Sequence, residues 1–252
     1  MSDRKQQVVD LLKSLETKAS QPLAFVNPNK YIQHNLNVGP GPAGVAALIK
    51  SLPPGTSVKT VRVFEDGDYV FAHSEYNFFG PKIGFDIFRY ESGLIVEHWD
   101  NLQEASAGPS PSGHTMTDGP TTISDADRTE ANKALMKRYM DDLLAGQRET
   151  FPSYFDGSKY IQHNPWVADT IPGLLAGLQA LASSGRAVVY KQVHMIVGEG
   201  NFVLVVSEAT FGGAPTGIYD LFRIENGKIA EHWDTLEAIP PRGQWKNDNG
   251  KF

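Results

Sequence analysis

The sequence predicts an α+β fold in which one domain is written twice along the chain. The hexapeptide Lys-Tyr-Ile-Gln-His-Asn at 30–35 returns unchanged at 159–164. A second motif, which begins at 85 and ends in Glu-His-Trp-Asp, returns at 219–234. The copies are offset by 129 residues at the first motif (30 to 159) and by 134 at the second (85 to 219). Because solenoid units span only ~20–50 residues, this offset indicates a duplicated domain.

The helical part of each copy comes first. Apolar residues at helical spacing over 4–19 predict an amphipathic helix, and a second, Pro-initiated helix is expected at 42–52. In copy two, apolar residues recur every four positions over 131–143, and the second helix is expected at 171–182.

The β part follows the helices in both copies. Alternating apolar residues between turn signals such as Ser92-Gly93 and Asn226-Gly227 predict four strands per copy. Helices ahead of an antiparallel run of strands are typical of an α+β unit whose helices cover one face of a curved sheet. The expected strands are 57–65, 69–76, 82–90 and 94–100 in copy one, and 187–197, 202–211, 216–224 and 228–234 in copy two.

A linker separates the two copies, and a tail ends the chain. The linker is rich in Gly, Pro and Ser, and His114 within it is expected to be solvated and without a role. The tail carries Trp245 and Phe252, which we expect to dock on the body of the protein. The expected organisation is domain 1 at 1–104, the linker at 105–123, domain 2 at 124–240 and the polar tail at 241–252.

The composition excludes several function classes. A net charge of −6 over 252 residues gives no basic surface for nucleic acid or an anionic membrane. The absence of cysteine excludes disulfides, thiolate catalysis and Cys-based metal sites. No apolar run approaches the ~18 residues of a membrane span, so we expect a cytoplasmic protein. Without a Gly-rich phosphate loop, no organic cofactor is expected.

The order of these motifs resembles the SnoaL-like (polyketide cyclase-like) branch of the NTF2-like superfamily. The resemblance covers both copies, about 5–103 and 127–238. It implies tandem cone domains, each a curved antiparallel sheet wrapped by helices around a deep apolar pocket, arranged as a pseudo-two-fold dimer within one chain. Members of the family include cyclases that work by intramolecular aldol condensation and relatives that isomerise, dehydrate or open epoxides. The fold indicates where chemistry would occur and leaves the reaction open.

The last hairpin of each copy carries the candidate acid–base residues. Side chains alternate along a strand, so His98 and Asp100 share one face. A three-residue turn would place Asp86 opposite His98, whereas a two-residue turn would place it opposite Trp99 and break the cluster. The resemblance favours the cluster, because the last aspartate of the family pattern lies in the pocket of the cyclases. Asp86 departs from that pattern, since its position corresponds to a pocket histidine in those enzymes.

A His–Asp pair in an apolar pocket could remove a proton next to a carbonyl group and return it elsewhere. We therefore expect cyclisation, isomerisation or dehydration of a small apolar or carbonyl compound; the alternative is a non-catalytic small-molecule-binding or scaffold protein whose polar cluster is structural. The candidate catalytic residues are Asp86, His98, Asp100, Asp220, His232 and Asp234, and the candidate substrate-binding residues are His34, Asn35, His73, Tyr76, His163, Asn164 and Trp166.

Other polar and aromatic residues are expected to be structural. Arg89 and Glu97 lie near enough for a cross-strand ion pair on the opposite face of the sheet. The imidazoles and carboxylates of copy one would permit Zn or Fe. However, close His-x-His spacing is absent and His73 is replaced by Val206 in copy two, so no metal is expected. The expected partners are a small molecule and the second copy, with no nucleic acid and no membrane. Which of the two pockets is active stays open.

Overall fold

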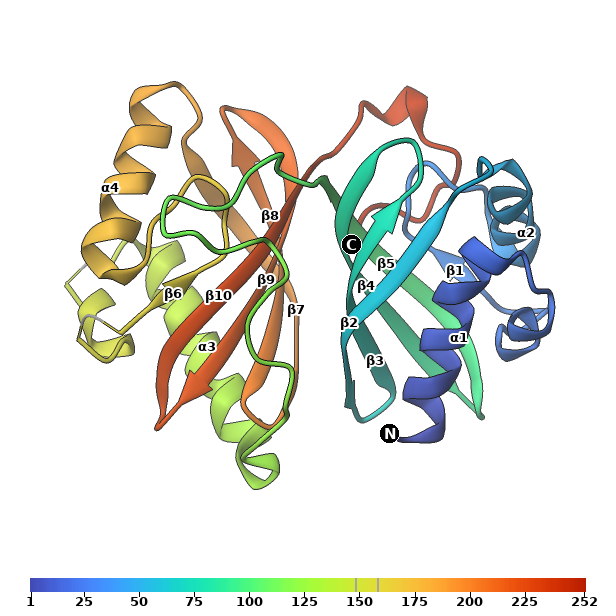
Figure 1. Cartoon of the computed structure of the whole chain (residues 1–252), viewed down its shortest axis with the longest axis horizontal. Helices are drawn as coiled ribbons and strands as arrows, with labels where there is room; N and C mark the ends of the chain where they lie inside the picture. Colours follow the sequence, from blue (N-terminus) through green and yellow to red (C-terminus); the bar gives the residue numbers. More distant parts are fainter. Residues whose placement is uncertain (148, 158) are drawn as a thin grey trace. The chain divides into compact units, whose positions relative to one another are not determined.

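The computed structural model describes residues 1–147, 149–157 and 159–252, and these form two compact units (Figure 1). Unit 1 consists of Met1–Ala105 and Pro240–Phe252, and unit 2 of Ser106–Ile239. Each unit holds a five-stranded sheet, so the expected α+β class in two tandem copies is confirmed. No helix in the described part of the chain is long and apolar enough to cross a membrane.

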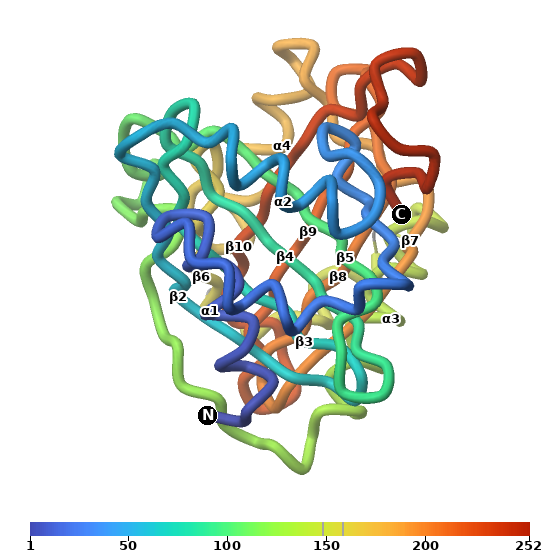
Figure 2. The backbone as a smooth tube through the Cα atoms, turned by 90° about the vertical axis from the view of Figure 1, so that its right-hand side faces the viewer, coloured from blue at the N-terminus to red at the C-terminus, as the bar shows by residue number. Residues whose placement is uncertain are grey.

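Unit 1 places its helices before its long strands. The sheet order is β1-β5-β4-β3-β2, with β1 parallel to β5 and the other neighbours antiparallel. In Figure 2, α1 lies over the strands on the side that faces the viewer. The elements are α1 (Asp3–Thr17), η1 (Gln21–Phe25), β1 (Ile32–Gln33), α2 (Gly41–Ser51), β2 (Ser57–Asp66), β3 (Tyr69–Asn77), β4 (Pro81–Glu91), β5 (Leu94–Glu104) and η4 (Arg242–Gln244).

Unit 2 repeats this plan with the sheet order β6-β10-β9-β8-β7. The two-residue strands β1 and β6 were not expected from sequence; each carries the Ile-Gln pair of the repeated hexapeptide and lies parallel to the last strand of its unit. The elements are η2 (Ala126–Arg128), α3 (Thr129–Ala145), η3 (Phe151–Tyr154), β6 (Ile161–Gln162), α4 (Thr170–Ser183), β7 (Val188–Glu199), β8 (Phe202–Phe211), β9 (Ala214–Glu225) and β10 (Lys228–Ala238).

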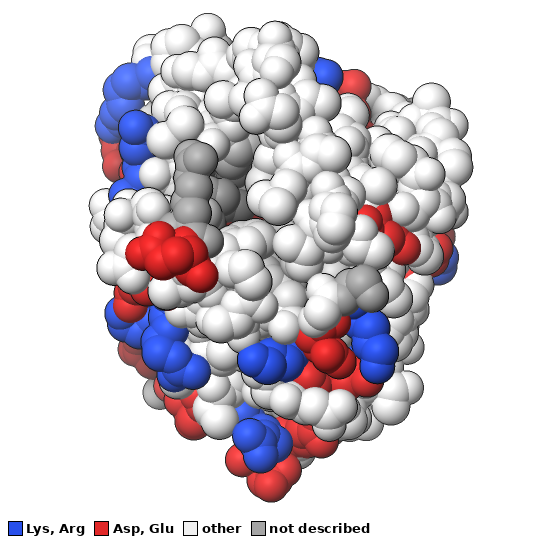
Figure 3. Space-filling view, turned by 90° about the vertical axis from the view of Figure 1, so that its left-hand side faces the viewer, with Lys and Arg blue, Asp and Glu red and all other residues white. Residues whose placement is uncertain are grey.

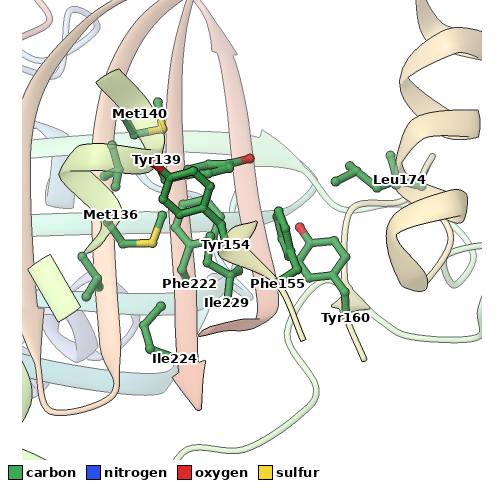
Figure 4. Packing of buried hydrophobic residues seen from close by; sticks show 13 residues of the cluster. Met136, Tyr139, Met140, Tyr154, Phe155, Tyr160, Leu174, Phe222, Ile224 and Ile229 are labelled. Carbon is green, nitrogen blue, oxygen red and sulfur yellow. The ribbon is translucent and has the colours of Figure 1, made fainter. Parts of the chain in front are cut away.

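An apolar core forms between the helices and the concave side of each sheet. In unit 1, Val8, Leu11 and Leu12 of α1 pack against residues of β3, β4 and β5. In unit 2, Tyr139 of α3 meets Phe222 of β9 edge-on, with ring centroids 5.9 Å apart (Figure 4). The helical spacing seen in the sequence therefore corresponds to the buried face of the first helix in both copies.

The last hairpin of each unit combines a two-residue turn with a β-bulge. Ser92 and Gly93 both have positive φ, and Glu91 pairs directly with Leu94. The register shifts by one between Arg89 and Tyr90, where Val96 is the extra residue. As a result Asp86 lies opposite Asp100, and neither expected pairing of Asp86, with His98 or with Trp99, occurs. A two-residue turn alone would place Asp86 and His98 on opposite faces of the sheet. The extra residue of the bulge reverses this, so Asp86, His98 and Asp100 share one face.

The segments that come after the two sheets are packed in a crossed order. Residues 106–123, which come after the sheet of unit 1, belong to unit 2, while residues 240–252 belong to unit 1. The tail lies beside the stretch after β1, where Lys246 N donates to Leu36 O at 2.9 Å (Figure 2). Asn247 Nδ2 donates to the carbonyl oxygens of Asn35 and Val38. Each of these extensions is therefore a fixed part of the unit that contains it.

Candidate functional site

A buried histidine–aspartate pair lies at the centre of each unit. In unit 1, His98 Nε2 is 3.0 Å from Asp86 Oδ1, and His98 Nδ1 is 2.9 Å from Gln33 Oε1. The same Gln33 oxygen accepts the backbone N–H of Asn35 at 2.8 Å, which fixes the orientation of the amide. Because Gln33 Oε1 is an acceptor, His98 Nδ1 donates to it, and Nε2 is the ring nitrogen that faces Asp86.

A second carboxylate, Asp100, completes the group. Its Oδ2 accepts from Asn35 Nδ2 at 2.5 Å, while Asn35 Oδ1 accepts the backbone N–H of Asn37. Asp100 Oδ1 is buried without a hydrogen-bond partner. The nearest cation is the buried Lys251 from the tail, whose Nζ lies 3.8 Å from Oδ1 and donates to the Asp100 carbonyl oxygen at 2.7 Å. The charge of this carboxylate is therefore compensated within unit 1.

Unit 2 builds the same group from the second copy. His232 bonds Gln162 Oε1 through Nδ1 and Asp220 Oδ1 through Nε2, both at 2.9 Å. Asn164 Nδ2 donates to Asp234 Oδ2 at 2.8 Å, and Asp234 Oδ1 is again buried without a hydrogen-bond partner. Among the described residues, no lysine or arginine forms an ion pair with Asp234. The unpaired oxygen of Asp234 is thus free of the neighbouring cation that Asp100 has.

A tyrosine hydroxyl donates to the first aspartate of each group, but it comes from different strands. In unit 1 the donor to Asp86 is Tyr76 on β3, which lies opposite Val58 on β2. In unit 2 the donor to Asp220 is Tyr190 on β7, at 3.0 Å, and it lies opposite Ala209 on β8. The aromatic residue has changed places with a small one across the strand pair. In both units, one tyrosine hydroxyl group therefore donates to the first aspartate of the group, Asp86 or Asp220.

Burial and charge shift the pKa values within unit 2. Burial raises the pKa of Asp234 to about 6, and Asp220 adds to the rise, while His232 and Asn164 oppose it. Burial disfavours the imidazolium form of His232, but the hydrogen bond that His232 donates to Asp220 and the charges of both aspartates outweigh it and raise the pKa of His232. The pKa of Asp234 is therefore closer to neutrality than that of an ordinary aspartate, and the pKa of the neighbouring histidine is raised as well.

A cavity of about 290 Å³ lies in unit 2 between the end of α3, η3 and the start of β7. Of its lining residues Tyr190 bonds the polar group, through Asp220, and Leu144, Phe151 and Val189 contribute apolar surface. In unit 1, by contrast, Glu16 at the end of α1 accepts the backbone N–H of Val58 at 2.8 Å. That contact fastens the first helix of unit 1 to β2, the strand that occupies the place of β7.

Four candidate substrate-binding residues do not join these groups. His34 and His163 lie on the opposite face, where each bonds a glutamate (Glu97 and Glu231) and stacks on the tryptophan of the last strand. His73 bonds Arg62 at 3.2 Å and stacks on Phe85, because its neighbour Ala72 occupies the inward position of β3. Trp166 stacks on Phe211.

The remaining candidates, Asn35, Asn164 and Tyr76, do bond the aspartates. The expected cross-strand ion pair is confirmed on the outer face, with Arg89 Nε donating to Glu97 Oε2 at 2.8 Å. The sequence interpretation missed Gln33, Gln162 and Tyr190. The two glutamines belong to the repeated hexapeptide and lie two residues before Asn35 and Asn164, so along a strand they point to the same side as these asparagines. Tyr190 lies in no repeated motif, so the sequence gives no signal for it.

Three groups in the described residues bring His, Asp or Glu ligand atoms within 4.8 Å of one another. Two of them are the acid–base groups. There both ring nitrogens of the histidine already bond protein atoms, so neither is directed at an ion. The third group is His114, Asp118 and His163. Both ring nitrogens of His163 contact protein oxygens there too, but His163 Nδ1 and His114 Nδ1 both face Asp118, a member of the group, at 2.7 and 3.6 Å. His114 was expected to be solvated, but it is half-buried and bonds Asp169.

The comparisons with known proteins concern the fold. No family model matches this chain, and no curated protein matches it. Among solved structures, TsrD from Streptomyces laurentii is 21% identical with a TM-score of 0.36, and the match covers 41% of this chain and 91% of that one. IdmH from Streptomyces antibioticus, a proposed polyketide cyclase, is 17% identical with a TM-score of 0.35, over 42% and 91% of the two chains. An NTF2-like protein of unknown function from Cytophaga hutchinsonii is 13% identical with a TM-score of 0.35, over 47% and 95%. Each of these matches covers less than half of this chain and most of the other.

Proposed function

We propose that unit 2 catalyses proton transfer at the carbon next to a carbonyl group of a small apolar compound. This step is shared by aldol-type cyclisation, isomerisation and dehydration. The observation that carries the proposal is the buried Oδ1 of Asp234, which has no hydrogen-bond partner and belongs to a carboxyl whose pKa is raised to about 6 beside His232. A general base is most effective when its pKa lies near the working pH, and burial supplies that shift here.

In this mechanism Asp234 Oδ1 accepts the proton from the substrate carbon. The proton-binding sites of His232 are occupied by Gln162 and Asp220, so His232 acts through its positive charge. Tyr160 supplies a hydrogen-bond donor, because its hydroxyl oxygen accepts from Gln162 Nε2 at 3.2 Å and its own hydrogen remains available. A donor at the forming enolate oxygen stabilises the charge that develops there. The proton on Asp234 then returns to the product.

The test follows exchange of carbon-bound hydrogen, which needs only the first step and no knowledge of the final product. A panel of cyclic ketones and 1,3-diketones is incubated with the full chain in D₂O, and deuterium incorporation is followed by NMR. We expect Asp234→Asn to slow the exchange by at least ~100-fold, as removal of a general base does. Asp100→Asn is the matched control and should change the rate less than ~3-fold, since its group lies outside the proposed active unit.

Two results would contradict this proposal. The first is exchange by the wild type that persists unchanged in Asp234→Asn. The second is the absence of exchange with every ketone that binds, because a bound ketone that keeps its hydrogens indicates a binding protein. For unit 1 the charge of Asp100, compensated by Lys251, disfavours proton transfer.

A further inference from the structure

A second polar group of unit 2 lies where residues 106–123 meet the stretch after β6. The rings of His114 and His163 have centroids 5.0 Å apart, and Asp118 contacts both. Asp118 Oδ1 is 2.7 Å from His163 Nδ1, and its Oδ2 is 3.6 Å from His114 Nδ1. Two imidazole nitrogens and one carboxylate therefore converge on one point.

The other nitrogen of each ring is held by a carboxylate. His114 Nε2 is 3.2 Å from Asp169 Oδ2, and His163 Nε2 is 2.8 Å from Glu231 Oε1. A carboxylate in that position accepts the Nε2 hydrogen, so Nδ1 is the ring nitrogen that can bind a metal ion once it carries no proton. Metal-binding histidines usually have this outer carboxylate or carbonyl partner, which fixes the tautomer and the ring orientation. Here both rings have one.

We propose that His114, Asp118 and His163 bind one divalent transition-metal ion such as Zn²⁺. Imidazole nitrogens and a carboxylate are suitable ligands for these ions, and water completes the coordination in sites with three protein ligands. The Thr115 carbonyl oxygen, 2.9 Å from His163 Nδ1, lies at the same point. In the absence of an ion, the acceptors Thr115 and Asp118 require a proton on His163 Nδ1, so metal binding releases that proton.

The backbone around these ligands is already fixed. Trp233 Nε1 donates to the Asp118 carbonyl oxygen at 2.9 Å. Gly119 has a φ of +93°, and a Cβ atom there would lie 2.7 Å from Glu231 Oε1 and 3.0 Å from the Trp233 ring, so only glycine allows this approach. Ser112 Oγ accepts the backbone N–H of Asp169 at 2.8 Å, and this bond holds the residues before His114 beside Asp169, the carboxylate that His114 contacts. The site thus needs little rearrangement to bind an ion.

Unit 1 offers a natural control for this site. There the tail presents the Gly250 carbonyl oxygen to His34 Nδ1 at 3.0 Å, as Thr115 does to His163. The residue before Gly250 is Asn249, where His114 precedes Thr115. The metal-ligand set is therefore a property of unit 2 and of residues 106–123.

The experiment measures Zn²⁺ binding by calorimetry, and Co²⁺ binding by its visible absorption, on the full chain after treatment with chelator. The wild type should bind one equivalent more than His114→Ala or Asp118→Asn. Asp169→Asn should weaken binding by ~10–100-fold, as loss of an outer carboxylate does. The control is His194→Ala, because His194 pairs with Glu208 at 3.4 Å outside the group, and it should bind as the wild type does.

The difference between variants also separates this site from the acid–base groups, which contain histidine and aspartate as well. An ion bound at His232 would be retained by His114→Ala, so the stoichiometry would not change. Equal stoichiometry and affinity in the wild type and in His114→Ala would overturn the proposal. Failure of the wild type to bind either ion at millimolar concentration would overturn it too, and would leave His163 with a structural role through its bonds to Thr115 and Glu231.

Discussion

Units 1 and 2 have the same polar group but differ in what surrounds its second aspartate. Asp100 has Lys251 3.8 Å from its unpaired oxygen, whereas Asp234 has no such lysine and has its pKa raised to about 6 by burial. In the segments that pack on these groups, Lys251 comes after Gly250 and Met116 after Thr115. The extension of unit 2 therefore has a methionine where the extension of unit 1 has the lysine that lies beside Asp100.

The two units also differ in the number of apolar side chains that they expose. Exposed apolar side chains gather in unit 2, with Leu143 and Leu144 on α3, Leu175 on α4 and Val189 on β7. Figure 3 shows that the upper part of the unit 2 face carries few charged side chains. In α1, by contrast, Lys13 and Glu16 pair with each other and bond the backbone of Val58. An apolar ligand would therefore be attracted to unit 2.

The sharpest test of this comparison is a pair of substitutions with opposite effects on stability. The pKa of Asp234 is about 6 in the folded state and ordinarily near 3.9 in the unfolded chain, so the folded state binds the proton more tightly. That stability is present below pH ~4 and is lost as the pH rises through 6, a cost of about 3 kcal/mol. Asp234→Asn should remove this cost and stabilise unit 2 by about 3 kcal/mol at pH 8, with little effect at pH 4.

Asp100→Asn should do the reverse in unit 1. It leaves the buried Lys251 without its carboxylate, which we expect to cost about 2 kcal/mol at pH 8. Amide hydrogen exchange of β10 and β5 peptides measures the two units separately. A loss of stability in both variants would show that the two aspartates are equally structural.

Removal of the cation gives the next largest effect. Lys251→Met takes away the positive charge beside Asp100 and the hydrogen bond to its carbonyl oxygen, so we expect unit 1 to lose about 2 kcal/mol. Hydrogen exchange of the β5 peptide against urea concentration measures the loss. Lys246→Met, in the exposed part of the same tail, is the control and should change stability by less than ~0.5 kcal/mol. Similar results for both lysines would mean that Lys251 does not compensate Asp100.

The smallest effect concerns the exchanged tyrosines. Tyr76→Phe and Tyr190→Phe each remove one hydrogen bond to a buried carboxylate, so both should cost about 1.5 kcal/mol in their own units. The double change Tyr190→Val with Ala209→Tyr copies the arrangement of unit 1 into unit 2. It should recover most of the stability that Tyr190→Val alone loses. If the double variant is no more stable than Tyr190→Val, the strand from which the tyrosine comes, and not only its hydroxyl group, determines the contact with Asp220.

The sequence predicted more of the fold than of the hydrogen bonds within the site. The repeat and its strand pattern indicated two α+β copies, because apolar periodicity is a property of the local sequence. The group of Asp86, His98 and Asp100 was expected only with a three-residue turn, yet it forms with a two-residue turn and a bulge at Val96. A bulge depends on how the two strands pack, so Val96 gives no local signal of it.

The sequence also could not assign the partners from distant segments. His34 was expected near a substrate, but it sits at the opposite parity from Gln33 and Asn35, a distinction that required β1 to be recognised as a strand. Lys251 and His114 lie in stretches whose composition suggested a tail and a linker. Their contacts span 151 residues to Asp100 and 55 to Asp169, and no local pattern encodes such a separation.

The crossed packing of residues 106–123 and 240–252 has a consequence for the history of the duplication. In a freshly duplicated gene, either copy can be deleted and the survivor keeps all its parts. Here, deletion of copy two together with the tail would take away the Asn247 contacts and Lys251 from unit 1, and deletion of copy one with its extension would take Thr115 and Asp118 from unit 2. Each copy therefore depends on residues that are encoded together with the other copy, so neither can be deleted without loss of contacts in the unit that remains.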